Sequence, residues 1–462
     1  MTTSSIVAAI AALALQAASA QKINGWYPCS IQTFASPTPN PTSSSSSASS
    51  SVADEQIHIP GGVGMSLDEP NKISAIFRSL LLPSDLALRT ATGAPSVECA
   101  EFTMPLCHDA MCASNATVKV FVKRMLAQSR VPAPKALWVL QGGPGASSVN
   151  MESIMSTLYD APGSSLGGSV DIYTMDHRGT GRSSKLSCVA TQIETSGSPT
   201  KGQVTSDNFP ACVKDINTQL SDDGDANLLR GYSTTAAATD LSKMISILDT
   251  SASGQTYVYG VSYGTYLVER LMQLANPSIK GYVLDGVVSQ SGSKSGQKLS
   301  FADWAANTNE VGEGFLTACA KDPACGAHFP TTNAKDTLRS VLSAMDKNPS
   351  SSKCSQLTAS GVGTGTPPSV LVRSVLSQLL QVQAARSLIP ALIYRLSRCN
   401  AGDITAIANF FTAYVNIFGG TDESDAYDST MLYNLVALSE LFTYPTPSRA
   451  SLVASYLNTT IA

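Results

Sequence analysis

Residues 256–268 read TYVYGVSYGTYLV, a β-branched and aromatic run that ends in Gly-Val-Ser-Tyr-Gly and continues into helix-forming residues. A Gly-x-Ser-x-Gly pentapeptide between a strand and a helix is typical of a nucleophile elbow, a strained turn that presents a serine hydroxyl. Because the serine at the tip of such a turn has a positive φ, a Cβ atom at Gly260 or Gly264 would collide with neighbouring backbone. The pattern predicts Ser262 as a catalytic nucleophile, with the positive end of a helix dipole beside it.

Strand-like and helix-like runs alternate on both sides of this turn. Residues 136–141 and 170–176 show no polar alternation, which is typical of strands buried on both faces of a sheet. A helix-like run follows each of them, and another strand-like run, 281–284, ends at Asp285. Two β-rich runs lie between 98 and 123, and the second alternates with a period of two, which suits an antiparallel strand. The alternation predicts a mostly parallel sheet with helices on both faces.

A glycine-rich loop follows the run 136–141 directly. Its sequence, Gln141-Gly-Gly-Pro-Gly145, lets backbone N–H groups approach a substrate oxygen closely. Such a loop and the amide of the residue after the nucleophile are the two halves of an oxyanion hole. The sequence therefore predicts the amides of Gly143 and Tyr263 as oxyanion donors. The alternative is a tight Gly-Pro turn without a role in chemistry.

Three motifs follow one another along the chain. They are Gly-Gly-Pro-Gly at 142–145, Asp-His-Arg-Gly-Thr-Gly-Arg-Ser at 176–183 and Gly-Val-Ser-Tyr-Gly-Thr at 260–265. Together they resemble the proline iminopeptidase and tripeptidyl aminopeptidase family of serine peptidases. The resemblance implies an α/β-hydrolase fold with a helical lid, no cofactor, and release of residues from a free peptide N-terminus through an acyl-enzyme on Ser262. The family often has histidine where this chain has Gln141, and its Arg-Gly-x-Gly-x-Ser loop is structural, so Arg178 and Asp176 are expected to brace the sheet.

The chain divides into five predicted segments. They are a signal peptide at 1–20, an N-terminal segment at 21–97 with a Ser/Pro-rich flexible loop at 36–52, an α/β-hydrolase core at 98–298, a helical lid insertion at 299–440 and a tail at 441–462. A short apolar run and the small-residue exit Ala18-Ser19-Ala20 indicate the signal peptide. Helical periodicity, for example over 370–398, indicates the lid.

Composition and cysteine usage favour a secreted protein. The formal net charge of −4 gives nucleic acid no electrostatic reason to bind, and no segment after the signal peptide is a candidate membrane anchor. Ten cysteines without Cys-x-x-Cys spacing, and only four histidines, favour disulfides over a metal site. Proximity in the sequence predicts the pairs Cys107–Cys112, Cys319–Cys325, Cys188–Cys212, Cys29–Cys99 and Cys354–Cys399. Glycosylation sequons at Asn115 and Asn458 fit secretion.

A serine nucleophile needs a histidine base and a carboxylate that orients it, and in this fold both follow the serine in the chain. The histidines of the chain are His58, His108, His177 and His328. Only His328 follows Ser262, and with Asp285 it satisfies the required order. Because no strand precedes His328, it is expected to be a lid histidine, and His177 is expected to be a loop histidine. We therefore identify no triad aspartate or histidine in this chain.

The resemblance accounts for this gap. The family continues past its lid with two more strand-helix units that carry the aspartate and then the histidine, whereas this chain stops at Ala462. The last strands of the sheet are thus expected to be missing, the run 281–284 to lie at an open edge, and the chain to be inactive by itself. The other hypotheses are a secreted non-catalytic binding protein on the same scaffold, an esterase or lipase-type hydrolase, and an enzyme that uses His177 or His328 as an unconventional base.

The expected partner is a peptide with a free N-terminus, and no nucleic acid, membrane, metal or cofactor is expected. The ammonium group of such a peptide needs a carboxylate to hold it. The candidates are Glu310, Glu313 and the acidic run at 422–428. The sequence predicts no particular oligomeric state or residue preference.

Overall fold

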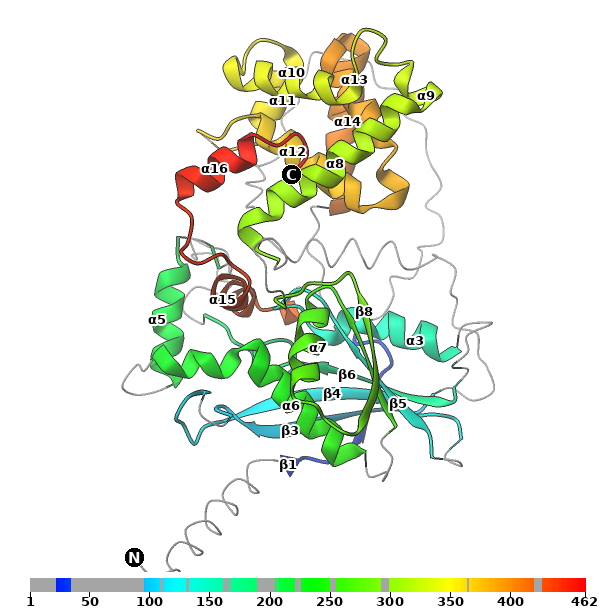
Figure 1. Ribbon diagram of the computed structural model, residues 1–462, viewed down its shortest axis with the longest axis vertical. Coiled ribbons are helices and arrows are strands. Elements are labelled where there is room, and N and C mark those ends of the chain that lie inside the picture. The colour runs from blue at the N-terminus through cyan, green and yellow to red at the C-terminus, as the bar shows by residue number, and fades with distance from the viewer. Residues whose placement is uncertain are drawn as a thin grey trace, which may run out of the picture. The chain divides into compact units, whose positions relative to one another are not determined.

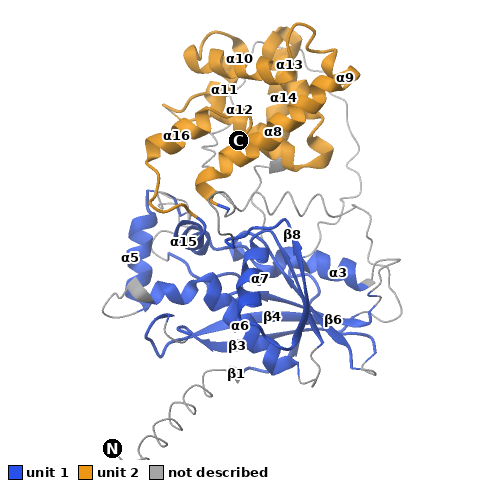
Figure 2. Cartoon of the chain, viewed as in Figure 1, with its two compact units in different colours: residues 1–35, 70–299, 421–441 blue, residues 36–69, 300–420, 442–462 orange. Residues whose placement is uncertain are grey.

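The structure is a computed structural model that describes most of the chain. The described residues are 22–34, 95–108, 111–129, 133–160, 166, 168–188, 204–205, 207–220, 226–249, 255–291, 299–363, 365–418 and 426–462. The predicted signal peptide at 1–20 and the predicted loop at 36–52 lie outside them. The chain separates into two compact units (Figure 2). We call them the α/β unit, from the described parts of 1–35, 70–299 and 421–441, and the helical unit, from those of 300–420 and 442–462.

The α/β unit is built on one sheet (Figure 1). Its described strands are β1 (Lys22–Ile23), β2 (Tyr27–Pro28), β3 (Val97–Pro105), β4 (Thr117–Met125), β5 (Lys135–Leu140), β6 (Val170–Asp176), β7 (Thr256–Val261) and β8 (Ile279–Asp285). Their order is β1-β3-β4-β6-β5-β7-β8, and β2 also pairs with β3. Pairing is parallel from β6 through β5 and β7 to β8, and antiparallel on the other side of β6. The predicted strands are confirmed, and the parallel half carries Ser262 at the end of β7.

Helices cover both faces of the parallel half. The described helices of this unit are η2 (Ser148–Met151), α3 (Glu152–Asp160), α5 (Phe209–Leu220), η3 (Ala226–Tyr232), α6 (Thr234–Leu248), α7 (Tyr263–Gln273) and α15 (Thr430–Glu440). Tyr259 and Val261 of β7 pack in the same cluster as Met155 of α3, whereas Gly260 lies against Val268 of α7. Because side chains of a strand point alternately to opposite faces, α3 and α7 lie on opposite sides of the sheet.

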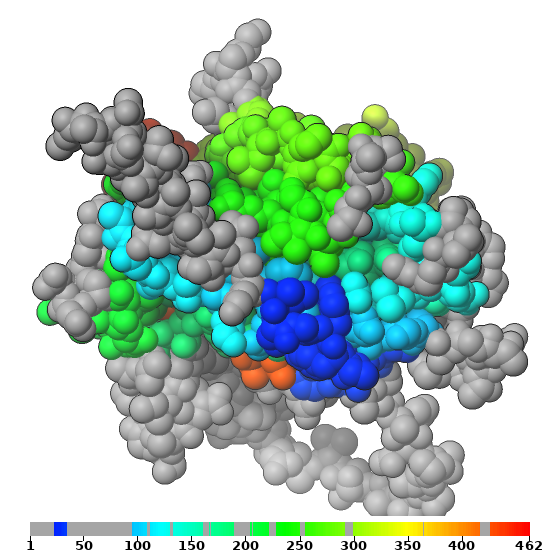
Figure 3. Space-filling model, turned by 90° about the horizontal axis from the view of Figure 1, so that it is seen from below, coloured from blue at the N-terminus to red at the C-terminus, as the bar shows by residue number. Residues whose placement is uncertain are grey.

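The segment 22–34 is fastened to the antiparallel side of the sheet and forms part of the surface there (Figure 3). Thr33 donates from its backbone N–H and its hydroxyl to the buried carboxylate of Glu152, at 2.6 Å each. The same carboxylate accepts from the buried ammonium of Lys123 at 2.6 Å. Because a buried charge is tolerated only when it is paired, Glu152 links this segment to β4 and α3 at a defined position.

The helical unit has a hydrophobic core of its own. Its described helices are η4 (Phe301–Asp303), α8 (Trp304–Lys321), α9 (Pro323–Gly326), α10 (Ala334–Lys347), α11 (Lys353–Ser360), α12 (Ser369–Gln381), η5 (Gln383–Ala385), α13 (Leu388–Arg398), α14 (Ala401–Phe418) and α16 (Arg449–Leu457). Leu338, Val375, Ile393 and Ile407, which are fully buried, bring α10, α12, α13 and α14 into one cluster. The predicted helical character of this region is confirmed.

The boundaries of the helical region differ from the predicted lid at 299–440 and tail at 441–462. Residues 426–441 return to the α/β unit, where Glu440 accepts from the Thr234 N–H at 2.9 Å and from the Tyr266 hydroxyl at 3.0 Å. The supposed tail belongs to the helical unit, because the buried guanidinium of Arg373 donates to the carbonyl of Thr459 at 3.0 Å. Periodicity identifies helices, but it does not say which unit a helix packs against.

All ten cysteines are paired, and the five predicted disulfides are confirmed. Each pair joins cysteines that are near neighbours in the sequence order, so each closes its own loop. No helix in the described part of the chain is long and apolar enough to cross a membrane. The described residues also contain no cluster of three or more potential metal ligands.

Strand β8 lies at an edge of the sheet, since among the described strands it pairs with β7 alone. Its side chains of Val283 and Leu284 are 55% and 39% exposed, and Val287 just beyond it is 58% exposed. An apolar edge strand with free backbone groups is prone to pair with other chains. The open edge expected at 281–284 is therefore present among the described residues.

We expect Val283→Lys to suppress concentration-dependent self-association and to change the free energy of unfolding by less than about 0.5 kcal/mol, because the side chain is largely exposed and lysine disfavours edge pairing. Light scattering over a concentration series and urea denaturation measure the two effects. Val453→Lys on α16, at a site that is 47% exposed, is the control and leaves association unchanged. A loss of stability above about 2 kcal/mol would mean that position 283 is a packed site.

Candidate active site

Ser262 occupies the turn between β7 and α7 with the backbone conformation that the sequence predicts. Its φ is 54° and its ψ is −126°, in the region that non-glycine residues rarely adopt. Its N–H donates to the carbonyl of Asp285 at 2.8 Å, and its carbonyl accepts from the N–H of Thr265 at 2.9 Å. These bonds hold the strained turn against the end of β8 and the first turn of α7. The predicted elbow is present, and the role of Ser262 as a nucleophile stays a prediction.

The two glycines of the elbow are required by close backbone contacts. A Cβ atom at Gly260 would lie 2.5 Å from the carbonyl oxygen of Gly264, and one at Gly264 would lie 2.6 Å from that of Gln141. Neither oxygen belongs to a flexible side chain, so it cannot move without moving the backbone. The strand-turn-helix unit can therefore close only when both positions lack a side chain.

The loop at 142–145 reaches Ser262. A Cβ atom at Gly142 would lie 2.6 Å from the Ser262 Cβ and 3.0 Å from its hydroxyl oxygen. Gly143 follows with a φ of 55°, which glycine adopts without strain. Tyr263 is the first residue of α7, and its N–H is one of the amides that a helix leaves without an intrahelical partner. The structure thus brings together the segments of the two predicted oxyanion donors, Gly143 and Tyr263, on either side of Ser262.

His177 supports this loop with both ring nitrogens. Its Nε2 donates to the carbonyl of Pro144 at 2.6 Å, and its Nδ1 accepts from the amide of Gln141 at 3.2 Å. The same amide group donates to the carbonyl of Ala146 at 3.0 Å. The imidazole is 3% exposed, and burial lowers its pKa against the opposing influence of the Pro144 carbonyl. His177 is therefore neutral and has no lone pair left for the proton of Ser262.

We expect the His177 ring to titrate below pH 6.5 and to keep its proton on Nε2. The unfolded chain binds the proton at about 6.5, so between that value and the lower folded pKa the unfolded state holds more protons, and stability falls as pH decreases. Ring-nitrogen NMR measures the titration. The chain has four histidines, and the signal that disappears in His177→Asn belongs to His177. A signal that titrates at or above pH 6.5 would contradict the buried, neutral ring.

The other described candidate members of a triad, Asp285 and His328, have contacts of their own. The carboxylate of Asp285 accepts from the Tyr259 hydroxyl at 2.8 Å, and burial together with this bond raises the pKa of Tyr259. His328 belongs to the helical unit, where its ring lies 5.2 Å from that of Tyr394. His58 lies outside the described residues. Within the α/β unit, the two described histidines, His108 and His177, have partners other than Ser262, and the absence of a triad stays a prediction.

Arg178 braces the α/β unit, as the resemblance implies, but through partners that the sequence did not single out. It is fully buried, and its guanidinium binds both carboxylate oxygens of Asp240 at 2.6 Å each. It also donates to the carbonyls of Leu106 and Gly231, at 2.6 Å each. Burial opposes ionisation of Asp240, but Arg178 and the nearby His108, at 2.7 Å, hold its pKa below the usual value. No periodicity or motif distinguishes Asp240 or His108 from ordinary surface residues.

Asp176, the other expected brace, lies at the end of β6 beneath the glycine-rich loop. Its carboxylate accepts from the Ser148 N–H at 2.6 Å and from Arg182 Nε at 2.7 Å. The aspartate is completely buried, and although burial opposes ionisation, Arg182 holds its pKa below the usual value. Asp176 therefore fixes the start of η2 behind the loop.

The segment 426–429 clamps the glycine-rich loop from outside. Asp428 accepts from the Ser147 N–H at 2.8 Å, and the Ser429 N–H donates to the Gly145 carbonyl at 2.8 Å. Asp428 is 5% exposed, so it positions the loop and is not a free anchor for a peptide ammonium. The other acidic residues of the run at 422–428 lie outside the described residues.

The remaining ammonium candidates lie on α8 of the helical unit. Glu313 pairs with Lys335 at 2.6 Å and with Arg339 at 2.7 Å. Glu310 is exposed on the same helix. A carboxylate that already pairs with two cations is a poor anchor for a third. Glu310 is therefore the better candidate of the two for binding a peptide ammonium.

A family model agrees with this geometry at the level of the fold. A family model described as alpha/beta hydrolase fold matches residues 135–325. No curated protein matches the sequence significantly. Among solved structures, a mutant epoxide hydrolase of Vigna radiata is 14% identical with a TM-score of 0.21, and the match covers 36% of this chain and 35% of that one.

Two further structures are similar at the same low level. The epoxide hydrolase of Aspergillus niger is 12% identical with a TM-score of 0.25, covering 64% of this chain and 59% of that one. Acetyl xylan esterase 1 from Thermoanaerobacterium is 13% identical with a TM-score of 0.24, covering 55% of this chain and 63% of that one. This chain thus spans between 35% and 63% of the length of the three proteins. With its parallel strands, its helices on both faces and the elbow at Ser262, the chain has the α/β-hydrolase fold.

Proposed function

We propose that this protein is a secreted serine hydrolase of the exopeptidase type, in which Ser262 attacks a carbonyl carbon and the amides of Gly143 and Tyr263 hold the resulting oxyanion. The observation that carries the proposal is the positive φ of Ser262 between two obligatory glycines, because a strained turn is costly and is kept where it presents a reactive group. A peptide with a free N-terminus is the proposed substrate, as the resemblance of the three motifs implies.

The chemistry available to the described residues is one half of acyl transfer. In the proposed site the Ser262 hydroxyl is the nucleophile and the amides of Gly143 and Tyr263 are the oxyanion donors, whereas the two described histidines of the α/β unit, His108 and His177, bind other partners. Without a base the serine proton must leave to solvent, so attack becomes faster as hydroxide concentration rises. Turnover by this chain is therefore expected to be no more than the residual rate that oxyanion binding supports.

Secretion is supported by two independent features. The first is the pattern at 1–20, which is typical of a signal peptide. The second is the pairing of all ten cysteines, since stable disulfides persist in oxidising compartments. Asn115 and Asn458, the asparagines of both glycosylation sequons, are exposed.

The test is covalent labelling with a fluorophosphonate, in which the Ser262 oxygen bonds to phosphorus and fluoride leaves. We expect labelling at Ser262 that is lost in Ser262→Ala, with a rate that rises continuously from pH 6 to pH 9. A rate that levels off near pH 7 would reveal a histidine base and contradict the incomplete site. Turnover of an aminoacyl-arylamide, compared with that of a simple ester, then separates exopeptidase from esterase chemistry.

The second candidate function is a non-catalytic binding protein on the same scaffold. It is favoured by the engagement of both His177 nitrogens away from Ser262. Complete absence of Ser262 labelling, even at pH 9, in a chain that remains folded would favour this alternative.

A further inference from the structure

The helical unit holds an open pocket of about 860 Å³ between α8, α9 and α13. Every residue that lines it belongs to this unit, whereas Ser262 belongs to the α/β unit. Neither the comparisons nor the proposed acyl transfer assigns a role to it. A pocket of this volume is in the range that accommodates a small organic molecule.

Aromatic rings form one wall of the pocket. Phe315, His328, Phe329 and Tyr394 all line it. The ring of Tyr394 packs against that of His328 at 5.2 Å and, edge to face, against that of Phe329 at 6.1 Å. Since rings prefer offset or edge contacts with other rings, this wall favours a ligand that carries an aromatic group.

A disulfide fixes part of the pocket lining. The disulfide Cys319–Cys325 joins the end of α8 to α9, and both cysteines line the pocket. Asp322, between them, caps α9 by accepting from the Cys325 N–H at 2.8 Å. The pocket is thus largely formed without a ligand, and its acidic residue is already engaged in the fold.

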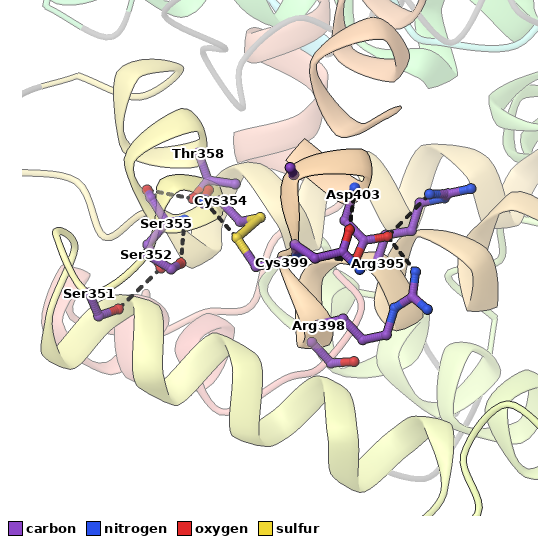
Figure 4. The surroundings of a disulfide bond; sticks show 12 residues. Ser351, Ser352, Cys354, Ser355, Thr358, Arg395, Arg398, Cys399 and Asp403 are labelled. Carbon is purple, nitrogen blue, oxygen red and sulfur yellow. Dashed lines mark hydrogen bonds and ion pairs between the residues drawn. A yellow bond between two sulfur atoms is a disulfide. The ribbon is translucent and has the colours of Figure 1, made fainter. Parts of the chain in front are cut away.

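Arg395 gives the pocket a positive charge that is not fully neutralised by a neighbouring carboxylate. It lines the pocket and is 44% exposed, and its Nη1 lies 3.1 Å from Asp403 Oδ1. The same Asp403 oxygen also accepts from Arg398 Nη2 at 2.7 Å (Figure 4). One carboxylate therefore serves two guanidinium groups, which leaves one positive charge in excess. Because a guanidinium has five N–H donors, Arg395 keeps donors that suit a carboxylate.

We propose that this pocket binds small aromatic carboxylates, with the ring against Tyr394 and the carboxylate on Arg395. The ligand is either a free aromatic acid or the C-terminal aromatic residue of a peptide, because the two share the ring and the carboxylate. His328, at the same wall, carries a ring N–H that can be a second donor to the carboxylate.

Calorimetric titration of the full chain with a matched ligand series tests the proposal. The probes are 3-phenylpropanoate, its neutral amide and 3-phenylpropylamine, which share the ring and differ in charge. We expect the carboxylate to bind about tenfold more tightly than the amide, because a charge-assisted hydrogen bond exceeds a neutral one by roughly 1–1.5 kcal/mol. N-acetyl-Ala-Ala-Phe represents the C-terminal aromatic residue of a peptide. If it binds more tightly than 3-phenylpropanoate, the ligand is a peptide C-terminus, and if it binds more weakly, the ligand is a free aromatic acid.

Two variants and one control connect binding to the pocket. Arg395→Gln should reduce carboxylate binding about tenfold, to the level of the amide, and Ala391→Trp should abolish binding of all probes by filling the pocket. Arg339→Gln, which removes one charge from an arginine side chain that is 52% exposed on α10, should change binding less than about twofold.

Equal or tighter binding of the amide or the amine, no effect of either pocket variant, or no binding at 10 mM (about 3 kcal/mol) would overturn the proposal. Ser262→Ala leaves this binding unchanged, so failure here is distinct from failure of the proposed acyl transfer.

Discussion

Arg178→Met is expected to lower the free energy of unfolding by about 3–5 kcal/mol, the loss typical of breaking a buried ion pair by removing one partner. The substitution leaves the carboxylate of Asp240, which is 1% exposed, without its guanidinium. It also removes the donors that bind the carbonyls of Pro105, Leu106 and Gly231. Urea denaturation at neutral pH, followed by a signal from the α/β unit, measures the loss.

The control for this prediction is Arg339→Met in the helical unit. Its side chain is 52% exposed and pairs with Glu313 at 2.7 Å, and an exposed pair of this kind contributes less than about 1 kcal/mol. Adding Asp240→Leu to Arg178→Met removes the buried carboxylate that has lost its guanidinium and should recover part of the loss. If Arg178→Met and Arg339→Met cost the same, Arg178 does not brace the unit.

Gly264→Ala is expected to lower the free energy of unfolding by about 3 kcal/mol and to abolish fluorophosphonate labelling of Ser262. The added methyl group would lie 2.6 Å from the Gln141 carbonyl oxygen and 2.7 Å from that of Leu140. Relief requires α7 to move away from β5, which displaces Ser262 from the loop at 142–145. Denaturation and labelling of the same preparation measure both effects.

Gly314→Ala is the matched control, and its expected effect has the opposite sign. Gly314 lies inside α8, and nothing lies within 4 Å of the place where its Cβ would be. Alanine in an open helical position stabilises a helix by about 0.5–1 kcal/mol relative to glycine. Stability losses of similar size in both variants would contradict the packing argument for the elbow.

The sequence predicted features that depend on residues close together in the chain. The elbow conformation of Ser262 follows from a strand, a five-residue motif and a helix that are contiguous. The pairing of the cysteines could be predicted for the same reason, because each pair closes a loop of its own. Strands buried on both faces leave an uninterrupted apolar run that can be read directly.

Other features of the site could not be read from the sequence, because their partners lie far apart in the chain. Ser147 and Asp428 are separated by 281 positions, and no local pattern links them. The glutamine at position 141 donates to the His177 ring, which is 36 positions away in the chain. From the sequence, His177 is expected to be a loop histidine and His328 a lid histidine. Only the contacts in the folded chain show which groups the ring of His177 binds.

The amino-acid sequence by itself determined the α/β-hydrolase fold, the elbow at residue 262, the glycine-rich loop and the disulfide pattern, since short-range sterics and apolar periodicity dictate them. Tertiary structure alone decided that residues 426–441 belong to the α/β unit, that Arg178 is held by Asp240, and that Arg395 lines an aromatic pocket. The reason is physical: a buried charge or an apolar helix face requires some partner, but many segments satisfy that requirement, and only the folded chain selects one.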